Sequence, residues 1–463
     1  MRVFNPTNST TDTHPTLAGH SNARRLSVVV VLGLLAAIFA PYVPGTRLRF
    51  EVAAGYIAVV ALLLTAKRAS SFERRILLAS VLLAAWTALR IVISPSGVLI
   101  NDIILWTNSN FLLLGISIYL GLKKSLIDNW RTFVWGILIA SVPINTISIF
   151  QLISPHDPVN QFIFANYGGT LNAIDLQART DFTNNAEWLA SVGRASGIFN
   201  GMHALAMFDI MILVICILEN QCLCYDLTLQ YVIICVGAFA LVGGICAASK
   251  TFYGGTLIIC VFLLLQKGNR KVYLPILAIL FVLIFRFVIS SGYLYNEGIV
   301  SITDAMGSYD ISEMTALRYG AGSESVFEGT VLKLLENPLD IFIGTGGDTR
   351  DYFMADSMLM PTIIAFGMYF AFFYFRILLG VARELFHSRN VNPLCKCCFI
   401  LHVFWLTAGL GIPTYQVGRL SPLLFILTFI AIELVNNEKN VCVSPSPFKS
   451  CEDTPVKLNE AVY

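Results

Sequence analysis

Long apolar segments are the feature that most restricts how this chain can fold. Many of them are close to the length of about 20 residues that an α-helix needs to cross the hydrocarbon core of a bilayer. Placing one helix on each segment predicts twelve transmembrane helices. Their expected ranges are 26–44, 52–66, 76–95, 102–121, 132–152, 202–218, 229–248, 251–266, 272–291, 357–375, 396–412 and 420–435.

The composition agrees with a membrane location. Of the 463 residues, 56% are hydrophobic and 13% are charged, whereas soluble domains carry about 25% charged residues. No basic run with interleaved aromatic residues occurs, so nucleic acid is not expected as a partner. The expected fold class is an all-α, polytopic integral membrane protein.

Polar stretches divide the chain into two tails, a membrane domain and two loops. Residues 1–25 and 436–463 are polar and poor in core-forming side chains, so we expect disordered tails on either side of a transmembrane domain at 26–435. Lys and Arg gather in the short turns on the side of the N-terminus, and such residues stay preferentially in the cytoplasm. Both termini are therefore predicted to be cytoplasmic, with the long loops 153–200 and 292–356 outside.

The later of these loops, 292–356, has the signs of a folded segment. Phe327, Val331 and Leu335 are spaced four apart, which is typical of one face of a helix, and Pro338 ends that helix. Loops of this length in compact proteins are usually functional. We therefore expect this loop to take part in the activity.

The chain has eleven cysteines, and none of them lies in the two long loops. Structural disulfides are therefore not expected there. Cys222-x-Cys224 and Cys395-x-Cys397-Cys398 have no histidine or second cysteine pair at zinc-site spacing, so we interpret them as apolar packing residues. No metal and no cofactor is predicted.

Ionisable side chains at the outward ends of membrane helices are costly to bury, and each is therefore a candidate for function. A group of arginines at that level suits a diphosphate, because each guanidinium offers a planar fork of donors that stays charged. The candidates are Arg90, Asp102, Arg194, His203, Asp209, Lys250, Arg286, Arg318, Arg350, Asp356 and Arg419. Of these, the predicted site comprises Arg194, His203, Lys250, Arg286, Arg318, Arg350, Asp356 and Arg419.

Some polar residues within the predicted helices also have structural explanations. Arg90, Asp102 and Arg286 either pair with one another, extend to the membrane surface or bind ligand. His402 has no charged neighbour in sequence and is predicted to be a packed, hydrogen-bonded core residue.

A polar stripe marks the helix expected at 132–152. Asn145, Thr146 and Ser148 either form hydrogen bonds to neighbouring helices or line a groove for sugars. Both interpretations stay open on the sequence alone.

Five segments, in this order, resemble the bacterial O-antigen polymerase (Wzy) and O-antigen ligase (WaaL) superfamily. The resemblance covers roughly residues 190–380 and the general pattern of helices. Gly193 to Ala204 is similar to an Arg-x-x-Gly-x-Phe segment that opens a helix, and Ser249-Lys250 stands where the family commonly has Ser-Arg. Arg318 precedes a helix, and Pro338 to Gly347 is similar to Pro-Leu-x-x-x-Gly-x-Gly. Asp356-Ser357 precedes a helix that contains Gly367.

Two departures from the family pattern matter, and the second of them favours the polymerase branch. Lys250 keeps the charge of the usual arginine but loses its bidentate geometry. Ligases resemble one another in a histidine just before the helix that follows the large loop, and this chain has Asp356 there.

The resemblance implies a membrane architecture like that of GT-C glycosyltransferases and a metal-independent reaction at the outer face of the bacterial inner membrane. Undecaprenyl-diphosphate-linked repeat units would be joined into O-antigen or a related polysaccharide. The implied partners are these lipid-linked glycans, membrane lipids, a chain-length regulator and a flippase.

The resemblance also implies roles for individual residues. Arg194 and Arg318 stabilise the departing diphosphate. Lys250 and Arg350 assist. The base is Asp356, Glu313, Glu324 or His203, and Asp356 is favoured among them. The alternative for Asp356 is a structural role, as an N-cap or as the partner of an arginine. His203, Arg286 and Arg419 complete the substrate-binding set.

Three other functions stay open. An O-antigen ligase would transfer the glycan to lipid A-core. A non-enzymatic transporter is disfavoured, because the turn at 219–228 is too short for the central connection between two six-helix halves. A flippase for the same lipid would differ in whether the repeat unit reaches the outer leaflet.

Overall fold

The structure is a computed structural model that describes residues 17–41, 49–53, 55, 57, 69–93, 110–167, 190, 194–199, 201–222, 227–264, 338–344, 359–410, 414–416 and 418–443. Within these ranges all regular elements are helices. They are α1 (Leu17–Phe39), α3 (Ser71–Ile93), α5 (Phe111–Gly121), α6 (Lys123–Asp128), α7 (Trp130–Ile153), α8 (Pro158–Tyr167), α11 (Met202–Cys222), α12 (Leu227–Cys246), α13 (Lys250–Leu264), α18 (Pro338–Ile343), α19 (Leu359–Phe366), α20 (Met368–Ser388), α21 (Pro393–Ala408), the 3₁₀ helix η2 (Thr414–Gln416) and α22 (Leu420–Val443).

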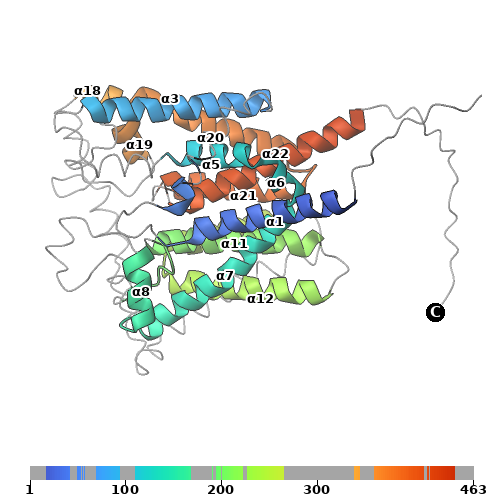
Figure 1. Cartoon of the computed structure of the whole chain (residues 1–463). Helices are drawn as coiled ribbons and strands as arrows, with labels where there is room; N and C mark the ends of the chain where they lie inside the picture. Colours follow the sequence, from blue (N-terminus) through green and yellow to red (C-terminus); the bar gives the residue numbers. More distant parts are fainter. Residues whose placement is uncertain are drawn as a thin grey trace, which may run out of the picture.

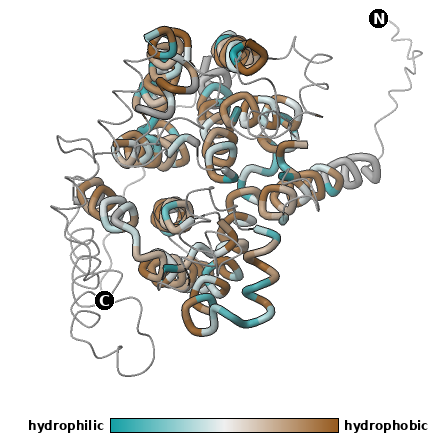
Figure 2. Tube along the Cα trace, turned by 90° about the vertical axis from the view of Figure 1, so that its left-hand side faces the viewer, coloured by the Kyte–Doolittle hydropathy of each residue, from teal (hydrophilic) through white to brown (hydrophobic). Residues whose placement is uncertain are grey.

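The long helices lie side by side in one bundle (Figure 1). Among the described residues, α3, α7, α11, α12 and α22 are long and apolar enough to cross a membrane, and α1, α5, α13 and α21 contain shorter apolar helices. Seen along the bundle, hydrophobic stretches predominate in the coils (Figure 2). The fold is that of a helical membrane protein.

The centre of the bundle is formed by α11 and α22. In each of them 78% of the apolar window is buried, compared with 39–44% in α3, α7 and α12. α11 packs against α7, α12, α13 and α21, whereas α22 packs against α5, α6, α20 and α21. The helices with lower burial therefore form the outside of the bundle.

The two ends of the bundle differ in their polar residues. One end, here called the Arg419 end, holds α8, α18 and the start of α22, and it lies on the left in Figure 1. The opposite end holds α6 and is called the Lys123 end.

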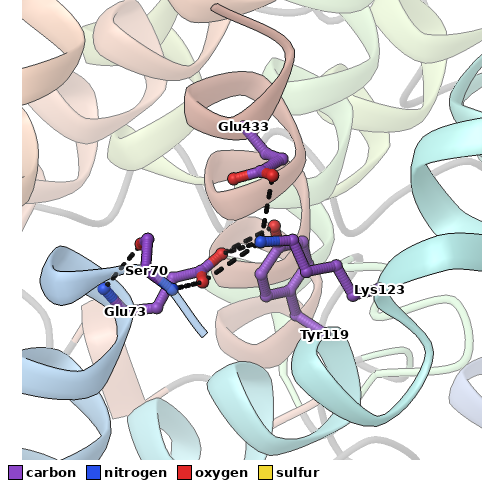
Figure 3. Close-up of polar contacts among 5 residues, drawn as sticks. All are labelled: Ser70, Glu73, Tyr119, Lys123 and Glu433. Atoms are coloured by element: carbon purple, nitrogen blue, oxygen red, sulfur yellow. Dashed lines mark hydrogen bonds and ion pairs between the residues drawn. The ribbon is translucent and has the colours of Figure 1, made fainter. Parts of the chain in front are cut away.

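At the Lys123 end an ammonium group joins three parts of the chain (Figure 3). Lys123 Nζ lies 2.9 Å from Glu73 Oε1 and 3.0 Å from Glu433 Oε1. Tyr119 donates a further hydrogen bond of 2.9 Å to Glu73. These contacts connect the start of α3 and the α5–α6 junction to the middle of α22.

Glu73 also explains where α3 begins. Its main-chain N–H donates to Ser70 Oγ at 3.2 Å, and Ser70 N–H donates to Glu73 Oε2 at 2.6 Å. This reciprocal pair is a capping box, which satisfies two main-chain donors at the helix start.

Several helix boundaries differ from the sequence prediction. α7 matches the expected 132–152 closely, but α1 begins at Leu17 and α22 continues to Val443. The parts of the two predicted tails at 17–25 and 436–443 are therefore helical. An apolar window marks only the lipid-facing part of a helix, and main-chain hydrogen bonding continues beyond it.

Two predicted helices also change their limits at the Arg419 end. The helix expected at 102–121 begins at Phe111, after the non-helical Asn110, in the described part of the chain. The helix expected at 357–375 is two helices, α19 and α20, separated by Gly367.

Gly367 explains why the helix expected at 357–375 is divided into α19 and α20. Its φ of +79° is unfavourable for any side chain, and an added Cβ would overlap the main chain of Phe342 and Ile343 in α18. The break therefore lets α18, which belongs to the loop 292–356, pack directly against α19 and α20.

No disulfide is formed by the cysteines whose side chains the structure describes, which are Cys216, Cys235, Cys246, Cys260, Cys395, Cys397 and Cys398. Cys395, Cys397 and Cys398 are buried in the apolar core, and Cys395 Sγ contacts the carbonyl oxygen of Ala431 at 3.2 Å. The interpretation of this cysteine group as packing residues is confirmed.

Candidate functional site

The residues 194–199, here called the Arg194 segment, lie at the Arg419 end and are all buried. Gln151 of α7 holds this segment through its carboxamide. Its Oε1 accepts from Ser196 N (3.1 Å) and Gly197 N (2.9 Å), and its Nε2 donates to Gly197 O (2.8 Å). A side chain thus satisfies main-chain groups that would otherwise be buried without partners.

Gly197 is required by this arrangement. Its φ is +59°, and an added Cβ would lie 2.9 Å from Ser148 Oγ. Ala195 N–H donates to Cys246 O at 2.9 Å, so the same segment also contacts the end of α12. The Arg-x-x-Gly-x-Phe pattern therefore encodes a tight, anchored turn.

Arg419 holds the segment from a second direction. Nη1 donates to Ile198 O at 2.7 Å and Nη2 donates to Ala40 O at 2.8 Å. The side chain is only 4% exposed. One guanidinium therefore joins the start of α22, the Arg194 segment and the residue after α1.

A second buried arginine lies beside Arg419. Arg49 Nε forms an ion pair of 3.3 Å with Glu51 Oε1, and the guanidinium lies 5.3 Å from the centre of the Phe111 ring. Burial raises the pKa of the Glu51 carboxyl, while Arg49 and Arg419 act in the opposite direction. We refer to Arg49, Glu51, Tyr167 and Arg419 as the Arg419 cluster.

Tyr167, at the end of α8, completes this cluster. The Arg419 guanidinium lies 5.1 Å from the centre of its ring, within the range of a cation–π interaction. Burial raises the pKa of the Tyr167 hydroxyl, and Arg419 opposes this shift. The first predicted outer loop therefore contributes a residue to the same place as the start of α22.

A buried hydrogen-bond network joins η2, which lies just before Arg419 in the sequence, to α21 and α22. His402 Nδ1 lies 2.8 Å from Tyr415 Oη, and His402 Nε2 lies 3.0 Å from Thr428 Oγ1. All three side chains are buried. The prediction that His402 is a packed, hydrogen-bonded residue is confirmed, and its contacts fix the chain just before Arg419.

A neighbouring contact brings together two of the segments identified in the sequence. His203 Nδ1 lies 2.8 Å from Ser249 Oγ and 3.2 Å from Thr251 Oγ1. Ser249 Oγ also accepts from Thr251 N at 3.3 Å, as an N-cap of α13 does. Lys250 is the first residue of that helix.

The turn before Ser249 contains a strained residue. Ala248 has a φ of +46°, a conformation that residues with a side chain rarely adopt. Such strain persists only where the surrounding structure enforces it, and it is common at functional sites. It brings Ser249 against His203 and orients the start of α13.

Residues 338–344, which belong to the predicted loop 292–356, are anchored on α3. Arg90 Nε donates to Gly344 O at 2.7 Å, and Arg90 Nη2 lies 3.6 Å from Asp340 Oδ1. Trp86 Nε1 lies within hydrogen-bond distance of Ile343 O (3.1 Å) and Phe366 O (3.0 Å). Arg90 is thus paired with the 338–344 segment, a contact absent from the sequence prediction.

The predicted stripe on α7 is only partly correct. Asn145 and Ser148 are buried, but Thr146 is exposed and its hydroxyl donates to Val142 O of its own helix. Ser141 and Gln151 take its place on the buried face. These four positions are three or four residues apart in the sequence, and this helical spacing could have predicted that they share one face of α7.

The predicted site residues divide into two groups. The structure places Arg194, His203 and Arg419 with their side chains and Lys250 by its backbone, all at the Arg419 end. Arg286, Arg318, Arg350 and Asp356, like Asp102, lie outside the described residues.

Arg49, Glu51 and Gln151 were missed by the sequence prediction. Arg49 and Glu51 lie between the helices expected at 26–44 and 52–66, and only their 4% and 0% exposure in the structure marks them as buried. Among the described residues, no group of three or more His, Cys, Asp or Glu side chains is arranged to hold a metal ion.

The arrangement concentrates buried guanidinium groups and main-chain turns at one end of an apolar bundle. Comparison with protein-family models and with curated proteins finds no match for this chain.

Proposed function

We propose that this protein is a metal-independent glycosyltransferase that polymerises undecaprenyl-diphosphate-linked repeat units into O-antigen or a related surface polysaccharide. The chain crosses the bacterial inner membrane twelve times in an arrangement like that of GT-C enzymes. Both termini are cytoplasmic, and the Arg419 end faces outward.

One observation carries the proposal. The Arg419–Ile198 hydrogen bond of 2.7 Å joins the segment that contains Arg194 to a second basic residue, at the same end of the bundle. Both arginines were selected from the sequence as ligands for a lipid diphosphate. The contact between His203 and Ser249 adds the start of α13, and thus Lys250, to the same region.

The arginines differ in the roles that we assign to them. Arg419 donates to two main-chain carbonyls, so it acts by positioning the Arg194 segment. Arg194, together with Arg318, binds the diphosphate, and Lys250 and Arg350 assist. The 338–344 segment, held by Arg90 and Trp86, aligns the late loop that carries Arg318, Arg350 and Asp356.

In the proposed reaction, the acceptor hydroxyl oxygen attacks the anomeric carbon of the donor glycan. Its proton passes to Asp356. The bond between that carbon and the phosphate oxygen breaks, and the lipid diphosphate leaves with the bonding electrons. Because negative charge grows on the leaving group, fixed guanidinium groups stabilise the transition state more than the ground state.

The test compares surface glycans from cells carrying Arg194→Ala, Arg419→Ala or Arg419→Lys in place of the wild-type chain. We expect the polymer ladder to fall at least about 100-fold in Arg194→Ala, a typical loss for removal of an oxyanion-binding donor. Arg419→Lys should also lose the polymer ladder, because one ammonium group cannot replace the planar guanidinium that donates to two carbonyls. Arg75→Ala, an exposed arginine at the Lys123 end, is the control.

The protein level in the membrane is measured by immunoblot for each variant. Loss of the ladder with a single repeat still on lipid A-core supports a polymerase. Polymer retained on the carrier lipid identifies a ligase instead, and loss of repeat units from the outer leaflet identifies a flippase. An unchanged ladder in Arg194→Ala removes this residue from the mechanism.

A further inference from the structure

A second polar site lies deeper in the bundle, around Asp209 of α11. Its side chain is fully buried. α11, which carries it, is together with α22 the most buried of the candidate membrane spans among the described residues. An ionisable residue inside a membrane helix is costly and typically marks an ion or substrate pathway. Nothing in the proposed glycosyl transfer uses Asp209.

Two neighbouring helices meet Asp209 at Gly243. A Cβ added to Gly243 of α12 would lie 3.0 Å from Asp209 Oδ2 and would overlap the Oδ1 atom of Asn145 from α7. The absence of a side chain at position 243 therefore lets a carboxylate oxygen and an amide oxygen approach the same point between three helices.

These polar atoms are not satisfied by the protein that the structure describes. Within the described residues, no hydrogen bond of normal geometry reaches the carboxylate oxygens of Asp209 or the polar atoms of the Asn145 amide, although this amide lies close enough to the carboxylate to interact with it. Buried polar groups in native proteins are rarely left in this state, and an ion or a water is the usual explanation. The ionisable group that faces Asp209 among these residues is the Cys246 thiol, which supplies no positive charge.

A row of polar side chains connects this point with the Arg419 end. Ser141, Asn145, Ser148 and Gln151 are fully buried and follow one another at intervals of three or four residues along one face of α7. We call them the polar column. Gln151 holds the Arg194 segment, and Ser148 lies against Gly197. The column places buried polar side chains between the bundle end and Asp209.

We propose that Asp209 and Asn145 form a binding site for a small monovalent cation, such as Na⁺, between α7, α11 and α12. Carboxylate and amide oxygens are ligands for hard cations, and one positive charge neutralises the one carboxylate. A divalent ion would leave an uncompensated charge in an apolar interior. The inference does not depend on the proposed glycosyl transfer.

The test measures the thermal unfolding midpoint of the purified full-length protein in detergent, at constant ionic strength, as NaCl replaces choline chloride. We expect a saturable rise of about 2 °C or more in the wild-type protein, because a ligand that binds only the folded state stabilises it. Asp209→Asn and Asn145→Leu should abolish the rise. Asp128→Asn, which alters an exposed carboxylate of α6, should retain it.

Binding of radiolabelled sodium to the same samples gives a readout independent of folding stability, so it also serves if one variant is unstable. Saturable binding by the wild-type and Asp128→Asn proteins that is absent in Asn145→Leu supports the site. The proposal is overturned if the wild-type protein neither binds sodium nor shifts its midpoint, or if Asp209→Asn responds to sodium like the wild type.

Discussion

Arg419 donates a hydrogen bond to the main-chain carbonyl of Ile198, 221 positions earlier in the chain. Its other terminal nitrogen reaches Ala40, 379 positions away. Arginine suits this role because its planar group has several donors in fixed directions. Three distant parts of the sequence are thereby held together at one end of the bundle, and the Arg194 segment acquires a defined position.

Gln151 is predicted to be important for stability because it makes three hydrogen bonds to the Arg194 segment. Gln151→Ala should lower the free energy of unfolding by about 2–4 kcal/mol, since it leaves buried main-chain groups without partners. The measurement is the thermal unfolding midpoint in detergent.

Thr146→Ala is the matched control on the same helix, because Thr146 is exposed and should change stability by no more than about 0.5 kcal/mol. Equal midpoints for the two variants would show that the Gln151 contacts contribute little.

Glu51 should make stability depend on pH. Burial raises the pKa of this carboxyl in the folded protein above its ordinary value of 4.5, so the folded state binds the proton more tightly than the unfolded state does. The resulting stabilisation is complete below the unfolded pKa and is lost as the pH rises through the folded pKa.

Glu51→Gln resembles the protonated carboxyl at every pH, so it isolates this effect. The variant and the wild type should have similar midpoints near pH 4, and the variant should become the more stable of the two as the pH is raised. A difference that moves in the opposite direction would show that Arg49 keeps the carboxylate ionised despite its burial.

Lys123 is predicted to hold the Lys123 end together. Lys123→Ala leaves Glu73 and Glu433 without their shared cation, and it should lower the free energy of unfolding by about 1–3 kcal/mol. Lys124→Ala, at the exposed neighbouring position, should change it by no more than about 0.5 kcal/mol.

The contribution of charge is separated by adding Glu433→Gln to Lys123→Ala. If like charges cause the loss, the double variant should be more stable than the sum of the two single changes predicts. Strict additivity would assign the loss to packing of the lysine side chain instead.

Gly367→Ala should destabilise the junction of α18, α19 and α20. The positive φ and the overlap with Phe342 and Ile343 predict a cost of about 1–3 kcal/mol. Gly380→Ala in α20 is the control, because an added Cβ there meets no atom within 4 Å. Alanine should stabilise that helix by up to about 1 kcal/mol, so the two midpoints should shift in opposite directions.

Much of the fold was predictable because apolar windows report directly on which residues face lipid or core. The expected helix 132–152 differs from α7 by only a few residues, and the burial of His402 followed from its position inside an apolar run. Breaks within a helix were harder to predict. Gly367 lies in a continuous apolar run, and its positive φ is imposed by the packing of α18.

By itself, the sequence determined the class of protein, the position of most described helices and the choice of Arg194, His203, Lys250 and Arg419 as candidates, since hydropathy and residue type are local properties. Only the tertiary structure decided that Arg419 reaches Ile198, that Gln151 holds the Arg194 segment and that Arg49, Glu51 and Asp209 are buried. Those facts depend on contacts between residues far apart in the chain, and such contacts arise only when the helices pack together.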